Sequence, residues 1–288
     1  MKKRAVYWLV AVFAVSVLSG CAAPEDKTVS IIQLTDPQLN FYSTPESFEK
    51  DVTTFTRAIA AANRLNPDFV IVTGDLVNTP FDAEQIKEYN RIGGLLKPTI
   101  PLYNLPGNHD VGNAPTAEDI SAYNEAFGAD YYTIEQDGLF AVVLNSLYLH
   151  HPEHVMDKAR DQETWLEAKL AEAQQKKDKN VVVFLHHSLF LNRSDEADEY
   201  FNIPTETRMR YLELFKKYGV SHVFSGHYHR NAFGTYDGME MVTSGPVGQP
   251  LGDDPSGLRI INISGGNIRH QYFPLDSLPE DIHLAETN

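Results

Sequence analysis

Apolar positions recur along the chain with two different periods, which predict strands and helices in turn. Short apolar runs bounded by turn-forming residues predict buried strands at residues 28–36, 68–75, 101–108, 139–146, 180–187 and 220–227. Amphipathic segments between these runs predict helices at residues 45–66, 82–96, 116–128, 161–177 and 205–219. Such alternation is typical of an α/β fold whose central strands are largely buried.

The pattern changes near residue 231, where short alternating runs are separated by glycine turns at residues 234–245 and 257–274. These runs predict antiparallel strands added to a sheet, since no linker separates them from the preceding elements. Gly219 follows the last helical segment, where we expect it to end the helix. We therefore expect one domain over residues 28–275, followed by a C-terminal tail at 276–288.

The first twenty residues differ from the rest, because a basic start, "MKKR", is followed by an apolar stretch at positions 5–18. This arrangement predicts a secretory signal peptide, since the stretch is shorter than the about 20 residues that cross a membrane as a helix. A retained N-terminal anchor is the alternative. Cys21 closes the segment and is the only cysteine, so no disulfide can form within the chain.

The residues "LSGC" at positions 18–21 resemble the lipobox of bacterial lipoproteins. The resemblance implies that Cys21 becomes the acylated first residue of the mature chain, with residues 21–27 as a short tether. It also implies an extracytoplasmic bacterial lipoprotein held at the membrane by its N-terminal lipid. Ala22 resembles the sorting pattern for the outer membrane, so the domain is expected to face the periplasm or the cell surface.

The formal net charge of the 288 residues is −15, and it becomes three units more negative when Lys2, Lys3 and Arg4 are removed. Binding to a nucleic-acid backbone requires a basic stripe, so no nucleic-acid partner is expected. A solvated acidic surface accounts for most of this charge. The pattern leaves the oligomeric state open.

Five of the predicted strands end in side chains that can bind metals. These are Asp36 with Gln38, Asp75, Asn108 with His109 and Asp110, His186 with His187, and His227 with His229. If the strands are parallel neighbours, their ends lie along one edge of the sheet, where open α/β folds place ligand sites. A single Asp or His in such a place is usually a helix cap or a loop residue, but five together favour a shared site.

The residue types at these strand ends indicate a class of metal. Carboxylates, imidazoles and amide oxygens without a thiolate suit two divalent ions such as Mn, Fe, Zn or Mg. Gly74, Gly107 and Gly226 each precede a candidate ligand, where glycine permits a sharp turn and a close backbone approach. His227 and His229 are two residues apart, so on an extended segment their side chains would point the same way.

The order of Asp36, "GD" at 74–75, "GNHD" at 107–110, His186 and "GHYH" at 226–229 resembles the calcineurin-like metallophosphoesterases. The resemblance covers residues 28–275 and implies a four-layer α/β/β/α sandwich of two mixed sheets. The stretches "TDPQ", "GNHDVGNAPT" and "DEADEYFNIP" are similar to a eukaryotic branch of this family that acts as metal-dependent phosphatases on phosphoserine and phosphothreonine.

Carried over residue by residue, the resemblance implies that Asp36 and His229 hold a first metal and that Asp75 bridges two metals. Asn108, His186 and His227 would hold the second metal. His109 would be the acid that meets the leaving group, and Asp110 would orient His109. His187 would face the substrate or lie behind the ligands, as would Arg230 and Asn231. Most of the family has a histidine where this chain has Gln38, whose amide oxygen can still coordinate a metal but is a weaker ligand for borderline ions.

These observations predict a hydrolase of phosphate esters, in which a hydroxide that bridges two metals attacks phosphorus. A phosphomonoesterase resembling protein phosphatases, with a phosphoprotein or small phosphoester as substrate, is the expected activity. A phosphodiesterase or nucleotidase on the same site is the alternative, and a non-catalytic surface lipoprotein is a further one. The histidines at 150, 151 and 154 are expected in a surface loop, since Pro152 breaks a helix. The segment 194–204 is expected to be a solvated loop, with a role at the rim of the site as the alternative.

Overall fold

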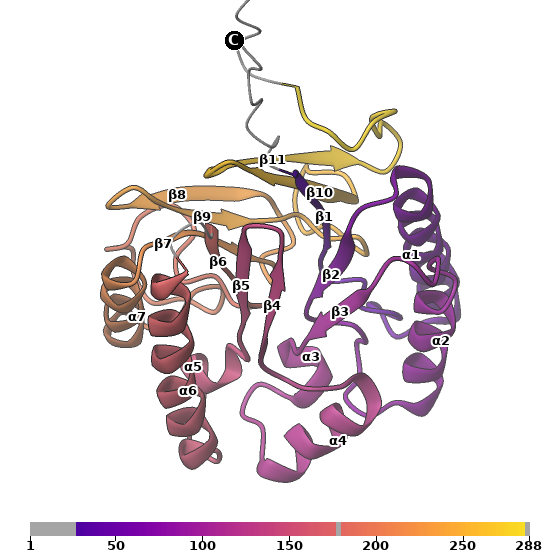
Figure 1. Ribbon diagram of the computed structural model, residues 1–288. Coiled ribbons are helices and arrows are strands. Elements are labelled where there is room, and N and C mark those ends of the chain that lie inside the picture. Colours follow the sequence, from indigo (N-terminus) through magenta and orange to yellow (C-terminus); the bar gives the residue numbers. More distant parts are fainter. Residues whose placement is uncertain (1–26, 177–179, 286–288) are drawn as a thin grey trace, which may run out of the picture.

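The computed structural model describes residues 27–176 and 180–285, which form two β-sheets packed face to face (Figure 1). The first sheet has the order β11-β10-β1-β2-β3. Strands β1, β2 and β3 run parallel to one another, β10 is antiparallel to β1, and β11 is antiparallel to β10. Its strands are β1 (Val29–Leu34), β2 (Phe69–Thr73), β3 (Leu102–Leu105), β10 (Gly257–Ser264) and β11 (Asn267–Pro274).

The second sheet has the order β4-β5-β6-β7-β9-β8, with β5, β6, β7 and β9 parallel and an antiparallel strand at each edge. Its strands are β4 (Tyr132–Gln136), β5 (Leu139–Val143), β6 (Asn180–Phe184), β7 (Val220–Ser225), β8 (Ala232–Tyr236) and β9 (Met239–Thr243). An apolar core lies between the sheets and includes Ile31 and Ile71 from the first and Val182 and Phe224 from the second.

Helices cover the outer faces, so the expected four-layer sandwich is confirmed (Figure 1). Helices lie beside each of the two sheets, and further helices follow β3 at the lower end of the view (Figure 1). Beside the first sheet are α1 (Pro45–Leu65) and α2 (Ala83–Gly93). Beside the second are α5 (Leu147–His150), α6 (Met156–Gln175) and α7 (Thr205–Lys217). The helices that follow β3 are α3 (Asn108–Val111) and α4 (Ala117–Phe127).

The ends of α1 show why the sequence pattern predicted this helix well. The Thr44 side chain accepts a hydrogen bond from the Ser47 amide at 3.1 Å, and Pro45 occupies the first turn, where its missing N–H costs nothing. At the other end, Asn66 adopts a left-handed conformation with φ of 55°. Gly219, with φ of 72°, likewise follows the end of α7 as expected.

Several features differ from the sequence-based expectation. The short elements β4, α3 and α5 were not predicted, and the runs after residue 231 form two hairpins, one at the edge of each sheet. The segment after Pro274 was expected to be a tail, but Ile282 is buried in the core and the Leu284 amide donates to Asn262 Oδ1 at 2.6 Å. This segment therefore packs on the domain at least as far as Leu284.

The predicted signal peptide, the tether at residues 21–26 and Cys21 lie outside the described residues. Among residues 27–176 and 180–285, no helix combines the length and the apolar character needed to cross a membrane.

Candidate metal centre

The ends of five strands meet between the two sheets, as the sequence pattern predicted, but they do not share one edge. The chain leaves β1, β2 and β3 in the first sheet and β6 and β7 in the second, and their carboxyl ends face the same region. The condition under which they would share an edge, a single row of parallel neighbours, is not met, because the five strands divide between two sheets, and hydrophobic periodicity does not reveal to which sheet a strand belongs. The two-sheet arrangement agrees with the family resemblance.

Asp36, Asp75 and His229 form one group of side chains whose ligand atoms lie within 4.8 Å of one another. All three are buried, and His229 Nε2 is 3.5 Å from Asp36 Oδ1. His229 donates from Nδ1 to the Gln249 carbonyl at 2.6 Å, which leaves the Nε2 lone pair directed at the carboxylates. A carbonyl can only accept, so this bond determines the tautomer that a metal ligand needs.

Gln38 borders this group and has a buried oxygen that lacks a partner. Its Nε2 donates to Asn78 Oδ1 at 3.1 Å, whereas Oε1 makes no hydrogen bond. A buried amide oxygen without a partner is costly in a folded protein, unless an ion or another absent group supplies the missing interaction. The main-chain amide of Gln38 donates to the Asp75 carbonyl at 2.8 Å, so an unpaired oxygen on this residue fits a metal ligand.

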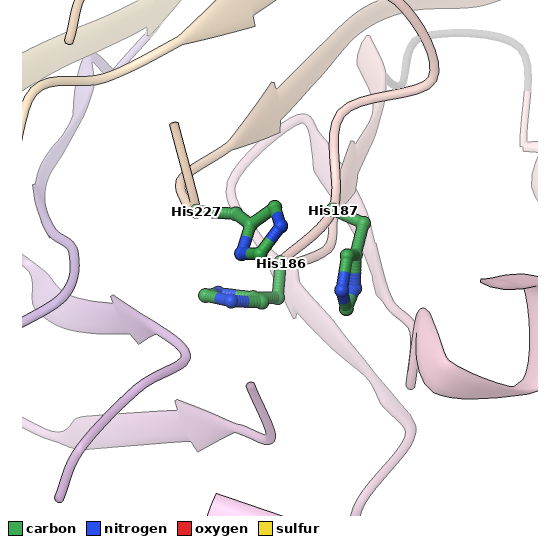
Figure 2. Close-up of side chains that lie close together, drawn as sticks. All are labelled: His186, His187 and His227. Carbon is green, nitrogen blue, oxygen red and sulfur yellow. The ribbon is translucent and has the colours of Figure 1, made fainter. Parts of the chain in front are cut away.

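His186, Asn108 and His227 lie next to this first group. His186 Nε2 is 3.3 Å from Asp75 Oδ1 and 3.2 Å from Asn108 Oδ1, and its Nδ1 donates to the Thr73 carbonyl at 2.9 Å. His227 lies beside His186, with ring centroids 4.9 Å apart (Figure 2). Its Nε2 donates to the Tyr200 carbonyl at 3.0 Å, so Nδ1 is the nitrogen left for a metal.

His187 is the third ring of this histidine cluster, and it differs from His186 in its partners (Figure 2). Its Nδ1 contacts Ser146 Oγ at 2.8 Å, and its ring lies 4.6 Å from that of His150. Because His186 contacts Asp75 and His187 is buried behind His227, the geometry favours His186 as the ligand. The burial of His187 and its contacts with Ser146 and His150 agree with the predicted position behind the ligands.

His150 was expected in a surface loop, and this prediction was wrong. It is the last residue of α5, and both of its ring nitrogens are buried without a hydrogen-bond partner. Pro152 prevents α5 from continuing, but the four residues of this helix fit before it. Burial lowers the pKa of His150 to about 4, so the ring packs on His187 as a neutral side chain.

The backbone at these ligands is strained. Asp36, Gln38, Asp75, His227 and His229 all have positive φ, between 38° and 67°. Left-handed conformations are rare for residues other than glycine and cost of order 1 kcal/mol or more each. They also correct the expectation that "GHYH" is extended: His227 and His229 join different groups rather than pointing the same way.

The glycines before the ligands permit close backbone approach, as predicted. Gly74 has φ of 86°, and a Cβ there would overlap the His186 ring. A Cβ on Gly107 would overlap the Asp75 carboxylate. Either substitution would therefore displace a candidate ligand.

The electrostatics of the site attract positive charge. Burial alone would lower the pKa of His186, but the Asp75 and Asp36 carboxylates raise it to about 9. Burial would raise the pKa of Asp75, yet His186 and His109 hold it well below its usual range. These carboxylates favour a positive charge beside them. Without a metal, a protonated imidazole provides that charge, and a divalent ion would provide it when bound.

His109 stands apart from the ligand groups. Its Nδ1 donates to the Asn78 carbonyl at 2.8 Å, and its main-chain amide donates to Asp75 Oδ1 at 2.9 Å. The side chain is partly exposed, unlike the buried candidate ligands. This placement suits a group that meets the substrate through Nε2.

Asp110 does not orient His109, which corrects the role implied by the resemblance. Its carboxylate accepts from the amides of Gly107, Leu76 and Val77 at 2.8, 2.9 and 3.1 Å. It therefore ties the turn after β3 to the turn after β2. The Asn78 carbonyl takes the place of Asp110 as the partner of the His109 ring.

Arg230 and Asn231 were predicted to contact the substrate or lie behind the ligands, but their described side-chain hydrogen bonds go elsewhere. Arg230 donates to the Leu251 carbonyl at 2.6 and 3.0 Å and to the Tyr228 hydroxyl at 3.1 Å. Asn231 Oδ1 accepts from the Gly245 amide and from Arg259. Both residues hold the loop that follows β9.

Tyr200 is a residue at the centre that the sequence did not reveal. Its hydroxyl accepts from Asn108 Nδ2 at 3.0 Å, which turns Asn108 Oδ1 toward His186, and its carbonyl holds His227. The segment 194–204 thus lies at the rim of the site, the alternative that position alone had suggested. The only signal in the sequence was an aromatic residue in an acidic loop shortly after His187.

The residues present fit a pair of divalent metals. The donors are oxygens and imidazole nitrogens, the buried Gln38 oxygen has no partner among the described residues, and main-chain carbonyls determine the tautomers of three histidines. Such ligands suit Mn, Fe, Zn or Mg. Two groups that adjoin at Asp75 agree with a two-metal centre.

Comparisons with known proteins agree with this centre. The family model for calcineurin-like phosphoesterases matches residues 29–231. A serine/threonine-protein phosphatase, CPPED1 of Danio rerio, is 38% identical over 264 residues, which cover 86% of this chain and 85% of that protein.

Two solved structures share the fold. A purple acid phosphatase from yellow lupin seeds superposes with a TM-score of 0.66 at 14% identity, covering 88% of this chain and 52% of the other. A dimetal phosphatase from Danio rerio superposes with a TM-score of 0.58 at 13% identity, covering 86% and 100%. The chain therefore belongs to the calcineurin-like phosphoesterase family, and it is a metal-dependent hydrolase of phosphate esters.

Proposed function

We propose that this protein is a dinuclear phosphomonoesterase that removes phosphate from phosphoserine and phosphothreonine in proteins. The observation that carries the proposal is the contact between two groups of candidate ligands at Asp75, whose carboxylate lies 3.3 Å from His186 Nε2. The choice of substrate rests on the similarity to a serine/threonine-protein phosphatase along most of both chains. An intact centre of this kind does not support a non-catalytic lipoprotein.

The proposed ligands divide between two metals. Asp75 bridges, because its carboxylate adjoins both groups. The first metal takes Asp36, Gln38 and His229, and the second takes Asn108, His186 and His227. His187, Asp110 and Tyr200 lie behind these ligands and hold them in place.

In the proposed mechanism the metal ions would activate water and neutralise the phosphate, while side chains of the protein supply and position the acid. When bound, two divalent ions neutralise the phosphoryl oxygens and make water a better nucleophile at neutral pH. His109 donates from Nδ1 to the Asn78 carbonyl, so its acid form is the imidazolium, which carries a second proton at Nε2 and gives it to the departing serine or threonine oxygen. Asp75 accepts the His109 amide and so keeps the acid at a set distance from the metals.

A panel of substrates tests this function. The protein is stripped of metal with a chelator, reloaded with Mn²⁺ and assayed against phosphoserine and phosphothreonine peptides, nucleoside monophosphates and a bis-aryl phosphodiester. We expect the highest kcat/KM for the peptides, and no hydrolysis by the Asp75→Asn variant, which would lose the bridge. Preference for the nucleotides or the diester would replace the proposal by the nucleotidase or phosphodiesterase alternative, because fold and ligands are shared by these activities.

The proposed place of action is outside the cytoplasm, with the domain tethered to a membrane, most simply the outer membrane, through acylated Cys21. Support for this address comes from the basic and apolar pattern of residues 1–20 and from "LSGC". The domain itself begins with β1 at Val29, so a tether of a few residues would hold it close to the lipid.

A further inference from the structure

A cavity of about 340 Å³ is lined by residues of both sheets and by none of the proposed metal ligands. It is found where the β8–β9 hairpin of one sheet approaches the β10–β11 hairpin of the other, at the upper end of the molecule in Figure 1. Its lining contains no carboxylate; the lining residues are Asn231, Ala232, Phe233, Val242, Arg259 and His270.

Arg259 is the one permanent charge in this lining, and only 6% of the residue is exposed. Its guanidinium donates to Ser244 Oγ at 2.7 Å, to His270 Nδ1 at 2.9 Å and to Asn231 Oδ1 at 3.0 Å. These three bonds use Nε and one hydrogen on each terminal nitrogen. One N–H on each terminal nitrogen remains without a described hydrogen bond, so the guanidinium keeps two donors for an anion.

The partners of Arg259 do not neutralise its charge. Ser244 and Asn231 are neutral, and His270 is neutral as well, because a ring nitrogen that accepts a hydrogen bond carries no proton. Burial and the nearby Arg259 lower the pKa of His270 to about 4, in agreement with this tautomer. A buried cation without an anion in contact costs several kcal/mol.

Two acidic side chains contact partners of Arg259: Asp254 accepts from the Asn231 main-chain amide at 2.7 Å, and Glu240 lies beyond His270. The Glu240 carboxylate is 3.1 Å from His270 Nε2 and 3.4 Å from His222 Nε2. By distance these three side chains could hold a metal. The bond from Arg259 argues against a metal in this group. It occupies His270 Nδ1 and so places the ring proton on Nε2, the nitrogen that faces Glu240, and a protonated nitrogen cannot bind a metal.

We propose that this cavity binds a small organic monocarboxylate, with its carboxylate on Arg259 and its apolar body against Phe233 and Val242. A single cation in the lining matches one negative charge and would leave a phosphate dianion partly uncompensated. Phe233 is 53% exposed, so it stands at the mouth of the cavity, while Val242, its partner across the hairpin, is buried. The site is independent of the proposed catalytic function.

The experiment uses benzoate as the probe and the neutral benzamide as its matched control. Both are titrated into the ¹⁵N-labelled protein after metal removal, so that neither can bind at a metal. We expect benzoate to shift the amide signals of residues 231–233 and to bind at least about tenfold more tightly than benzamide, which lacks the charge-assisted bonds. Arg259→Gln should abolish this difference.

A second pair of variants covers the case in which Arg259→Gln does not fold. Phe233→Ala should weaken benzoate binding several-fold, whereas Leu95→Ala, at an apolar side chain of similar exposure in the turn after α2, should leave it unchanged. Equal binding of benzoate and benzamide would overturn the proposal. So would equal effects of the two alanine variants, or shifts confined to residues around His109.

Discussion

Gln38 shows how a single side chain bears on the proposed first metal. Its buried oxygen has no partner among the residues that the structure describes. Its backbone is also left-handed, with φ of 38°, so the fold holds the side chain in place at some cost. A strained backbone together with an unpaired buried oxygen is expected of a residue that coordinates a metal.

Changing Gln38 should alter the affinity of the first metal. Gln38→His should tighten that site, most of all for Zn²⁺, because imidazole is the better ligand for a borderline ion. Gln38→Ala should weaken it. The measurement is titration of chelated protein with Mn²⁺ and Zn²⁺, with Gln249→Ala as the control, since its main-chain carbonyl still holds His229. Identical curves for all the proteins would remove Gln38 from the ligands.

His109 allows chemistry to be separated from metal binding. His109→Ala removes the proposed acid but keeps the main-chain amide that binds Asp75. We therefore expect both metals to remain while kcat falls by about 10²–10⁴, the usual contribution of a positioned acid. The loss should shrink for esters with good leaving groups. Elemental analysis of the metal content, measured together with kcat, distinguishes an acid from a metal ligand. A parallel fall in metal content and kcat would show that His109 is a ligand.

At the scale of elements, the loop between β6 and α7 does more than connect them. The Glu196 carboxylate accepts hydrogen bonds from three main-chain amides of the loop, those of Leu191, Asn192 and Arg193. The buried Arg208 guanidinium donates to three main-chain carbonyls of the loop, those of Ser194, Glu196 and Ile203. These bonds give the loop a defined shape without regular secondary structure. The loop can therefore present Tyr200 to Asn108 and His227 reproducibly.

Tyr200→Phe should weaken the second metal site. The variant loses the bond to Asn108 Nδ2, while the main-chain carbonyl still holds His227. Partners behind metal ligands are typically worth about 10–100-fold in affinity, and this phenol is half exposed, so we expect about tenfold. Titration with Co²⁺, followed by its visible absorption, measures the change, with Tyr228→Phe as the control. A Tyr200→Phe curve that matches the wild-type one would limit Tyr200 to packing.

At the scale of the whole molecule, two sheets that face each other bring together residues from Asp36 to His229. Each sheet supplies part of the centre, so the group of Asp36, Asp75 and His229 draws on both. The same stacking leaves the cavity at Arg259 where the two terminal hairpins approach each other. The centre and the cavity thus arise from one packing arrangement.

The proposed lipid anchor makes a prediction for the intact protein in a bacterial host. Cys21→Ser should prevent acylation and release the protein from the membrane fraction, while leaving hydrolysis and thermal stability unchanged, because the domain begins after the tether. Fractionation followed by mass spectrometry of the N-terminus measures this. Unchanged membrane association would indicate a retained apolar anchor instead.

The sequence alone was enough to predict most elements and most of the residues that gather at the centre. Strands such as β6 and helices such as α1 follow from short-range rules, namely hydrophobic period, capping and glycine turns. The glycine before Asp75 likewise signalled a tight turn, which the structure confirms. Donor types at successive strand ends indicated a metal, because few other sites use carboxylates and imidazoles in that pattern.

Only the tertiary structure decided which groups those side chains face. Asp110 is next to His109 in the chain, yet it binds amides of two turns, and Asn231 follows the "GHYH" segment but contacts Arg259 on another strand. Tyr200 reaches Asn108 across 92 positions of sequence. Such partners depend on how the two sheets pack, and packing depends on contacts between distant residues, which local periodicity does not encode.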